Sequence, residues 1–221
     1  MCAISSLQFG KNFNMVTSLK NARFIAGAAQ LHQAPADFGH EVAFVGRSNS
    51  GKSSAINAIT HNGKLARVSK QPGRTQQINF FEVAELQRMV DLPGYGFAKA
   101  PREVRESWTK LIEAYIAQRE SLRGLILVVD ARRGITELDW TLLEWCSHVA
   151  VPVHVLLSKS DKLSRSAAAL ALRSVGEVLH KANLSAELQL FSAVTGVGLA
   201  QVQGVVSRWL SGEKSRAPAE G

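Results

Sequence analysis

The sequence predicts an α/β fold built on a mostly parallel six-stranded sheet, with one antiparallel strand and helices on both faces. From residue 41 onward, apolar runs of strand length alternate with stretches of helix length. This alternation is typical of parallel strands joined by covering helices. Two of the runs, at 76–83 and 87–91, are separated only by a short turn, so that pair is expected to be antiparallel. Ligands of such sheets bind at the carboxyl ends of the strands.

The fold is expected to begin with a buried strand at 41–46, a glycine turn and a helix at 51–61. A polar loop at 62–75 leads to the antiparallel pair of strands. A second loop, at 92–100, precedes a helix at 101–120. Pro101 suits the first turn of that helix, because the N–H that proline lacks is unused there. The remaining elements are strand 124–130, helix 136–149, strand 152–157, helix 164–182, strand 187–191 and helix 197–210.

Residues 46–53 read Gly-Arg-Ser-Asn-Ser-Gly-Lys-Ser and fit the phosphate-loop pattern G-x-x-x-x-G-K-[ST]. The loop lies between a predicted strand and a predicted helix, where backbone N–H groups and the helix dipole attract an anion. Lys52 can reach the outer phosphates of a nucleotide, and the Ser53 hydroxyl can ligate Mg²⁺.

A D-x-x-G motif, Asp91-Leu-Pro-Gly94, follows the strand at 87–91. Its carboxylate can hold Mg²⁺ through water, and the Gly94 N–H can contact a γ-phosphate. Thr75, at the end of the preceding loop, is the best candidate for a hydroxyl that ligates Mg²⁺ only when the γ-phosphate is present. The alternative is a threonine that only shapes a turn.

The strand at 152–157 ends in Ser158-Lys-Ser-Asp161, which resembles the guanine-reading motif N-K-x-D. Asp161 can accept from the N1–H and 2-amino groups of guanine, and adenine would leave it poorly paired. Ser158 stands where asparagine is usual, so fewer bonds that brace the loop are expected. After the next strand, the Ala193 N–H of Phe191-Ser-Ala193 can donate to guanine O6.

These motifs together predict one nucleotide site. Lys52, Thr75, Gly94 and Asn49 are its candidate catalytic residues, and Ser53, Thr75 and Asp91 its candidate Mg²⁺ ligands. The residues expected to line the site are Gly46, Arg47, Ser48, Asn49, Ser50, Gly51, Lys52, Ser53, Ser54, Gly73, Arg74, Thr75, Gln76, Gln77, Asp91, Leu92, Pro93, Gly94, Ser158, Lys159, Ser160, Asp161, Phe191, Ser192 and Ala193.

Length and composition indicate one domain with extensions. The 221 residues are 46% hydrophobic and 20% charged, and no apolar run reaches the about 18 residues of a membrane-spanning helix. Residues 1–21 are expected to be a disordered leader, 22–211 the folded domain and 212–221 a flexible tail. The acid-free stretch 1–36 also fits an organelle transit peptide. Two cysteines exclude a disulfide framework and fit a cytoplasmic setting.

Basic residues gather near the phosphate loop. The net charge is +8, and no acidic residue lies between Glu41 and Glu82. Lys64, Arg67 and Lys70 lie beyond the loop and remain available to a polyanionic partner, of which RNA is the leading candidate. The alternative is a solvated basic face without a partner.

The motifs resemble the translation-factor-related P-loop GTPases, and most closely the EngB family of bacterial GTP-binding proteins. The resemblance covers residues 22–211. It rests on Gly46–Ser54, Pro72-Gly-Arg-Thr-Gln76, Asn79-Phe-Phe81, Asp91-Leu-Pro-Gly-Tyr-Gly96 with Phe97-Ala-Lys99, and Ser158-Lys-Ser-Asp-Lys162. The family usually has threonine at the position of Ser158.

The resemblance implies a single G domain that binds GTP and GDP with Mg²⁺, and we expect the protein to be a monomer. It also implies a role in assembling the large ribosomal subunit, with rRNA and ribosomal proteins as partners rather than DNA or membrane, and a link to cell division and septation.

Tyr95 stands where many GTPases carry a glutamine that orients the attacking water. A phenol cannot replace that amide, so slow intrinsic hydrolysis is expected. Asn49 suggests K⁺ as an additional cofactor, because some related GTPases with asparagine there bind K⁺ beside the phosphates. The alternative is that Asn49 only braces the loop.

Two other functions compete with a GTP-driven ribosome assembly factor. An ATP-dependent kinase would need an acceptor pocket and an arginine-bearing lid, which the sequence does not show. A septation or membrane scaffold that binds GTP structurally would need a membrane anchor or polymerisation, and no convincing anchor is present.

Overall fold

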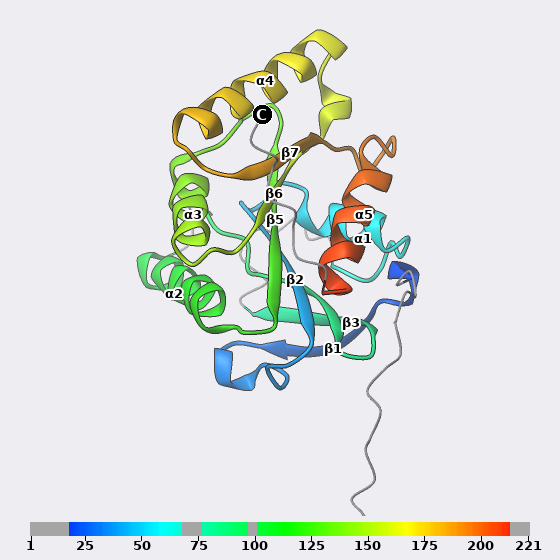
Figure 1. The fold of residues 1–221 in the computed structure, drawn as a ribbon, viewed down its shortest axis with the longest axis vertical. Coiled ribbons are helices and arrows are strands. Elements are labelled where there is room, and N and C mark those ends of the chain that lie inside the picture. Colours follow the sequence, from blue (N-terminus) through cyan, green and yellow to red (C-terminus); the bar gives the residue numbers. More distant parts are fainter. Residues whose placement is uncertain (1–17, 68–76, 97–100, 213–221) are drawn as a thin grey trace, which may run out of the picture.

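The computed structural model describes residues 18–67, 77–96 and 101–212. Over these residues seven strands form one sheet in the order β1-β3-β4-β2-β5-β6-β7. β3 runs antiparallel to both of its neighbours, whereas β2 is parallel to β4 and β5, and β6 is parallel to β5 and β7 (Figure 1). The strands are β1 (Arg23–Ala28), β2 (His40–Gly46), β3 (Ile78–Ala84), β4 (Gln87–Asp91), β5 (Leu122–Asp130), β6 (Val153–Ser158) and β7 (Ala186–Leu190).

The helices agree with the sequence prediction to within two residues at each end. They are α1 (Lys52–Ile59), α2 (Arg102–Gln118), α3 (Glu137–His148), α4 (Arg165–Lys181) and α5 (Leu199–Leu210), with short 3-10 turns η1 (Leu19–Asn21), η2 (Leu31–Gln33) and η3 (Ser160–Lys162). The α/β architecture with one antiparallel strand is therefore confirmed. No helix in the described segments is long and apolar enough to cross a membrane.

The predicted number of strands was wrong, because the sheet has a seventh strand, β1. β1 is an edge strand that pairs only with β3, through a register that shifts between Phe24 and Ala26. Only its last residue, Ala28, is buried. An edge strand with so little burial shows no alternation of apolar and polar residues, which is the signal that identifies strands in a sequence.

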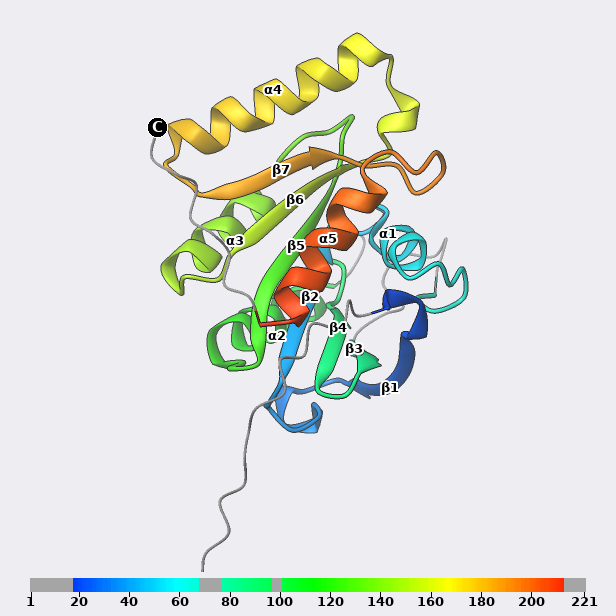
Figure 2. The same cartoon turned by 45° about the vertical axis from the view of Figure 1, so that its right-hand side comes forward.

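Two apolar cores cover the two faces of the sheet. On one face, side chains of α2, α3 and α4 pack in one cluster with those of the strands. On the other face, α1, α5 and η1 contribute to a second cluster. Figure 2 shows α1 and α5 together on one side of the sheet and α2 and α3 on the other.

The folded part of the chain begins earlier than the expected leader boundary. η1 belongs to the segment assigned to the leader, yet Leu19 is buried in the second core beside Ala66 and Phe81. Residues 1–17 lie outside the described residues.

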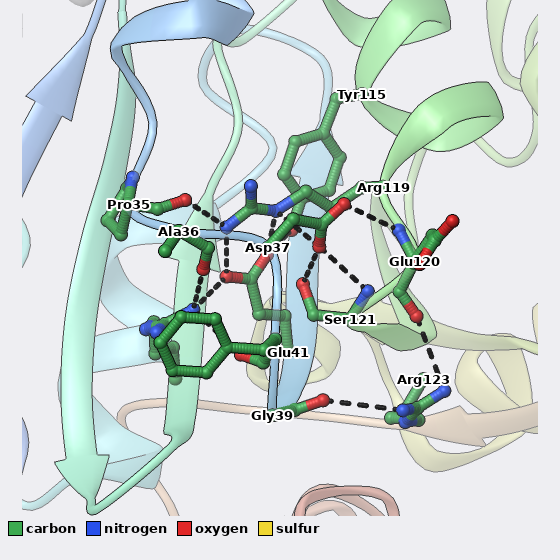
Figure 3. A network of polar contacts seen from close by, with 12 residues as sticks. Pro35, Ala36, Asp37, Gly39, Glu41, Tyr115, Arg119, Glu120, Ser121 and Arg123 are labelled. Carbon is green, nitrogen blue, oxygen red and sulfur yellow. Dashed lines mark hydrogen bonds and ion pairs between the residues drawn. The ribbon is translucent and has the colours of Figure 1, made fainter.

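A buried polar network fixes the amino end of β2 (Figure 3). The Glu41 side chain has no exposed surface and accepts from Arg119 Nη2 at 2.7 Å, Arg88 Nη1 at 2.8 Å and the Tyr115 hydroxyl at 2.8 Å. Arg119 also donates to the Pro35 carbonyl at 2.8 Å. The network thus joins the carboxyl end of α2 to the segment before β2.

The partners of Glu41 keep it ionised. Burial by itself raises the pKa of this carboxyl, but hydrogen bonds and the charge of Arg119, followed by bonds from Arg88 and Tyr115, outweigh it and hold the pKa below its ordinary value of 4.5. Burial and the charge of Glu41 raise the pKa of Tyr115 well above 10.0, so its hydroxyl remains a donor.

We expect Glu41→Gln to lower the free energy of unfolding by about 3–5 kcal/mol, because it leaves two buried guanidinium groups without their carboxylate. Chemical denaturation measures this loss. Glu120→Gln, at an exposed position next to Arg119, is the matched control and should change stability by less than about 0.5 kcal/mol.

The pH dependence of this difference is a separate check. A carboxyl with a lowered folded-state pKa contributes fully above its unfolded pKa, and the contribution is lost as pH falls through the folded pKa. The gap between wild type and Glu41→Gln should therefore be equal at about pH 7 and about pH 5 and shrink only in more acid solution. A gap that already closes near pH 5 would contradict a lowered pKa.

Candidate functional site

The phosphate loop connects β2 to α1 at the carboxyl edge of the sheet. Gly51 has φ of 101° and Asn49 has φ of 66°, so the loop turns twice through left-handed backbone. A Cβ on Gly46 would lie 2.4 Å from the Val128 carbonyl oxygen and 2.7 Å from Ser50 Oγ. This crowding requires glycine at that position.

The loop presents free backbone donors. Within the described residues, no group accepts from the backbone N–H of Asn49, Gly51, Lys52, Ser53 or Ser54. α1 has no side-chain cap and no acidic residue in its first turn. These N–H groups, together with the positive end of the helix dipole, can bind the phosphates of a nucleotide.

Lys52 and Asp91 meet beside these donors. Lys52 Nζ forms an ion pair with Asp91 Oδ1, and both side chains are buried. β4 delivers the carboxylate because β4 is parallel to β2 and pairs Asp91 with Phe44. Ser53, the next residue of α1, supplies a hydroxyl in the same turn. An oxygen-rich pair such as Ser53 and Asp91 suits Mg²⁺, which is held by few protein oxygens together with phosphates.

The segment after Asp91 lies against the phosphate loop. Leu92 and Pro93 are buried, and the Ser48 N–H donates to the Tyr95 carbonyl at 2.8 Å. A Cβ on Gly94 would lie 3.5 Å from the backbone of Ser48. No described residue accepts from the Gly94 N–H, so it can contact a γ-phosphate.

The Tyr95 side chain is buried and bonded to α3. Its hydroxyl donates to Asp139 Oδ1, and Asp139 also accepts from the Thr136 N–H at 2.8 Å as part of the capping box of α3. Burial, followed by the charge and hydrogen bond of Asp139, raises the pKa of Tyr95 well above 10.0. Tyr95 therefore anchors the D-x-x-G segment to α3, and its hydroxyl proton is already donated to Asp139.

Arg47 of the phosphate loop lies close to Gly96, which follows the D-x-x-G motif. A Cβ on Gly96 would meet Arg47 Nε at 3.0 Å. Nε is buried and has no hydrogen-bond partner among the described residues. The half-buried Arg47 side chain thus packs against the D-x-x-G segment.

The loop after β6 is bonded directly to the phosphate loop. The Ser158 hydroxyl donates to the Ser50 carbonyl, and Lys159 Nζ donates to the Asn49 carbonyl at 2.6 Å. Lys159 has φ of 57°, a left-handed backbone that directs its side chain across the loop. The bracing expected to be reduced by serine at position 158 is thus provided by its hydroxyl together with Lys159.

The loop after β7 orients the candidate guanine-reading carboxylate. The Ser192 hydroxyl donates to Asp161 Oδ1 at 2.7 Å, and this bond is the main reason that the pKa of Asp161 lies below its ordinary value. Phe191 is buried, and its carbonyl accepts from Ser160 N–H at 3.2 Å and Ser160 Oγ at 3.1 Å. In the described part of the chain nothing accepts from the Ala193 N–H, so it is free to bind a base.

The structure does not place every predicted residue at the site. Gly73, Arg74, Thr75 and Gln76 lie outside the described residues. Gln77 is described, and its side chain lies against Gly27 of β1 and donates to Asn79 at 3.3 Å. The assignment of Gln77 to the nucleotide site stays a prediction.

Asp130 is a site residue that the sequence analysis missed. It ends β5 beside Ser158 of β6. Asp130 Oδ2 accepts from Lys159 Nζ at 3.0 Å and from Arg132 Nη2 at 2.7 Å. Burial by itself raises the pKa of this carboxyl, but hydrogen bonds from Arg132 and Lys159 hold it well below 3.8. Only the adjacency of β5 and β6 would have revealed Asp130, since Asp-Ala-Arg is not a nucleotide-binding motif by itself.

Comparisons with known proteins agree with this geometry. A sequence model described as 50S ribosome-binding GTPase matches residues 41–159. The probable GTP-binding protein EngB of Coxiella burnetii (strain CbuK_Q154) is 46% identical over 201 residues, which cover 91% of this chain and 98% of that protein. The probable GTP-binding protein EngB of Nitrosococcus oceani is 50% identical over 191 residues, covering 86% and 96%.

A solved structure shares the fold. The crystal structure of a probable GTP-binding protein engB aligns with a TM-score of 0.62 and 24% identity, covering 76% of this chain and 98% of that chain.

The fold and the sequence matches define a P-loop GTPase of the ribosome-binding class. Within that class, the chain belongs to the EngB family of GTP-binding proteins, and the resemblance inferred from its motifs is confirmed.

We expect Asp130→Asn to weaken GDP binding about ten- to a hundredfold, because a hydrogen bond to a charged group contributes about 1.5–3 kcal/mol. The variant keeps the shape of the side chain but loses the charge that holds Lys159. Isothermal titration calorimetry measures the change. Arg132→Gln removes the other cation at Asp130 and should leave the affinity within about threefold; equal losses in both variants would show that Asp130 does not act through Lys159.

Proposed function

We propose that this protein is a GTP-dependent switch that assists assembly of the large ribosomal subunit and thereby supports normal cell division and septation. The observation that carries the proposal is the convergence of free phosphate-loop donors, the D-x-x-G segment and the guanine-reading loop at one edge of the sheet. Membership in the ribosome-binding GTPase family supports the choice of partner. We place its action in the cytoplasm, as a monomer that contacts rRNA and ribosomal proteins.

Each residue of the site has a proposed role. Lys52 neutralises charge on the β- and γ-phosphates, and the N–H groups of residue 49 and of residues 51–54 hold their oxygens. Ser53, Thr75 and Asp91 would hold Mg²⁺, with Asp91 acting through water. When bound, the metal would supply positive charge that stabilises the negative charge developing during hydrolysis.

Selection of guanine is assigned to the loops after β6 and β7. The Asp161 carboxylate accepts from the N1–H and 2-amino groups, and the Ala193 N–H donates to O6. Ser192 holds the carboxylate in place through their 2.7 Å hydrogen bond. The stem of Lys159 packs on the base while its amine remains bonded to Asn49 and Asp130.

Hydrolysis by the isolated protein is proposed to be slow. Tyr95 is bonded to Asp139 and is not available to position water. The nucleotide state therefore persists until a partner acts, which suits a switch rather than a metabolic enzyme.

K⁺ dependence follows from Asn49. Asn49 is exposed, has a left-handed backbone and belongs to the phosphate loop. We expect K⁺ to accelerate hydrolysis relative to Na⁺ at the same concentration, and Asn49→Ala to abolish the difference. Equal rates for both proteins in both salts would exclude a cation site at Asn49.

The proposed function is tested by sedimentation with purified large ribosomal subunits. We expect the protein to co-sediment with a non-hydrolysable GTP analogue and to be released with GDP, because Gly94 can sense the γ-phosphate. Lys52→Ala removes the cation that neutralises the phosphates, so its sedimentation should not respond to nucleotide. A wild-type protein that binds GTP but never sediments with the subunits would refute a direct ribosomal role.

A further inference from the structure

Charge is distributed unequally between the two faces of the sheet. The helices that cover one face carry several acidic side chains: Glu103, Glu106 and Glu113 on α2, Glu137, Asp139 and Glu144 on α3, and Glu177 on α4. On the opposite face, η1, α1, residues 60–67 and α5 contain no acidic residue. An acid-free face repels polyanions less than the rest of the surface does.

The acid-free elements form one continuous wall. Leu19 of η1, Ala66 of the loop after α1 and Val202 of α5 belong to the same apolar cluster. Gln203 Nε2 of α5 donates to the Ile59 carbonyl at 2.8 Å. Figures 1 and 2 both show η1 beside the loop that follows α1.

Three exposed cations lie on this wall. Lys20 projects from η1, and Lys64 and Arg67 from the loop after α1. No described acidic residue lies within ion-pair distance of any of them. Their charge is therefore not neutralised by the described part of the protein.

The carboxylates of Glu82 and Glu187 are paired with other residues and do not neutralise these three cations. Glu82 of β3 pairs with Arg23. Glu187 lies at the far edge of the sheet, on β7, and pairs with His154 at 2.9 Å and Arg208 at 3.4 Å.

An exposed aromatic ring lies on β1, the strand that follows η1 and Lys20 in the chain. Phe24 of β1 is 55% exposed, although its ring contacts Phe81 edge-on with centroids 6.1 Å apart. Phe24 and Phe81 are directly opposite each other in the antiparallel pair, so both side chains lie on the face of the second core. Cations beside an exposed aromatic ring are typical of surfaces that bind single-stranded nucleic acid, because phosphates pair with the cations and an unstacked base covers the ring.

We propose that Lys20, Phe24, Lys64 and Arg67 form an RNA-binding surface, here named the basic wall, in which the three cations contact phosphates and Phe24 stacks on an unpaired base. The inference rests on the proposed ribosomal function and specifies which side of the protein meets RNA. Residues 60–67 follow the carboxyl end of α1, whose first turn forms the phosphate site, so the length of this helix, about 12 Å, separates this part of the basic wall from the phosphate loop.

The test compares two triple charge reversals. The basic-wall variant is Lys20→Glu/Lys64→Glu/Arg67→Glu. Its control, Lys110→Glu/Arg173→Glu/Lys181→Glu, makes the same change of net charge at exposed positions of α2 and α4. Binding to a labelled single-stranded RNA and to purified large ribosomal subunits is measured from about 50 to about 200 mM salt.

We expect the basic-wall variant to lose at least about tenfold in affinity for both ligands and to lower the slope of log affinity against log salt by about two to three. The control should stay within about threefold of wild type. Phe24→Ala should weaken RNA binding about fivefold or more without changing the slope, because stacking involves no counterion release. GDP affinity, unchanged in every variant, verifies that the fold is intact.

Other results would overturn the proposal. Equal losses in both triple variants would show that only net charge matters. Wild-type binding that the basic-wall variant retains would place the contact elsewhere and leave the ribosomal function standing. Loss of subunit binding with normal binding of naked RNA would identify a protein partner instead. A wild-type protein that binds neither ligand would refute the proposed function as well.

Discussion

The phosphate loop depends on hydrogen bonds that hold its carbonyl oxygens from outside. Lys159 binds the Asn49 carbonyl and Ser158 binds the Ser50 carbonyl, both from the loop after β6. Beside these satisfied acceptors, the N–H groups of residue 49 and of residues 51–54 have no partner among the described residues. The phosphate loop thus has free N–H donors, while the carbonyl oxygens of Asn49 and Ser50 are already bonded. Binding a polyphosphate requires such donors. The loop after β6, to which we assign guanine recognition, is therefore bonded directly to the phosphate loop through Lys159.

The phosphate loop is also bonded to the D-x-x-G segment, and the strand before it, β2, is held at its amino end. Ser48 donates to the Tyr95 carbonyl, and the Tyr95 hydroxyl is tied to Asp139 at the start of α3. At the far end of β2, the Glu41 network ties the strand to α2. β2 is consequently fixed at both ends. This arrangement favours a rigid phosphate loop.

Sequence reasoning succeeded where the signal is local. The phosphate loop, the D-x-x-G segment and the elements from β2 to α5 are each defined by contiguous residues, and buried parallel strands are strongly apolar. It failed where the signal is tertiary. β1 is an exposed edge strand whose pairing depends on β3. The paired residues Arg23 and Glu82 are more than 50 positions apart in the sequence. Asp130 and Asp139 become site residues only because β5 lies beside β6 and α3 lies beside Tyr95. The role of Ser158 was underestimated because the carbonyl it reaches, that of Ser50, is distant in sequence.

The central claim is that one guanine nucleotide is bound where these loops converge, and Asp161 tests it most directly. Calorimetry measures the affinity of Asp161→Asn for GDP and for xanthosine diphosphate. The substitution changes the hydrogen-bonding pattern of the protein, and xanthine changes that of the base. An amide can donate to the 2-oxo group of xanthine but leaves the 2-amino group of guanine poorly paired. The account predicts that GDP affinity falls at least about tenfold while xanthosine diphosphate binds more tightly than to wild type. Unchanged GDP binding with no gain for xanthosine diphosphate would contradict it.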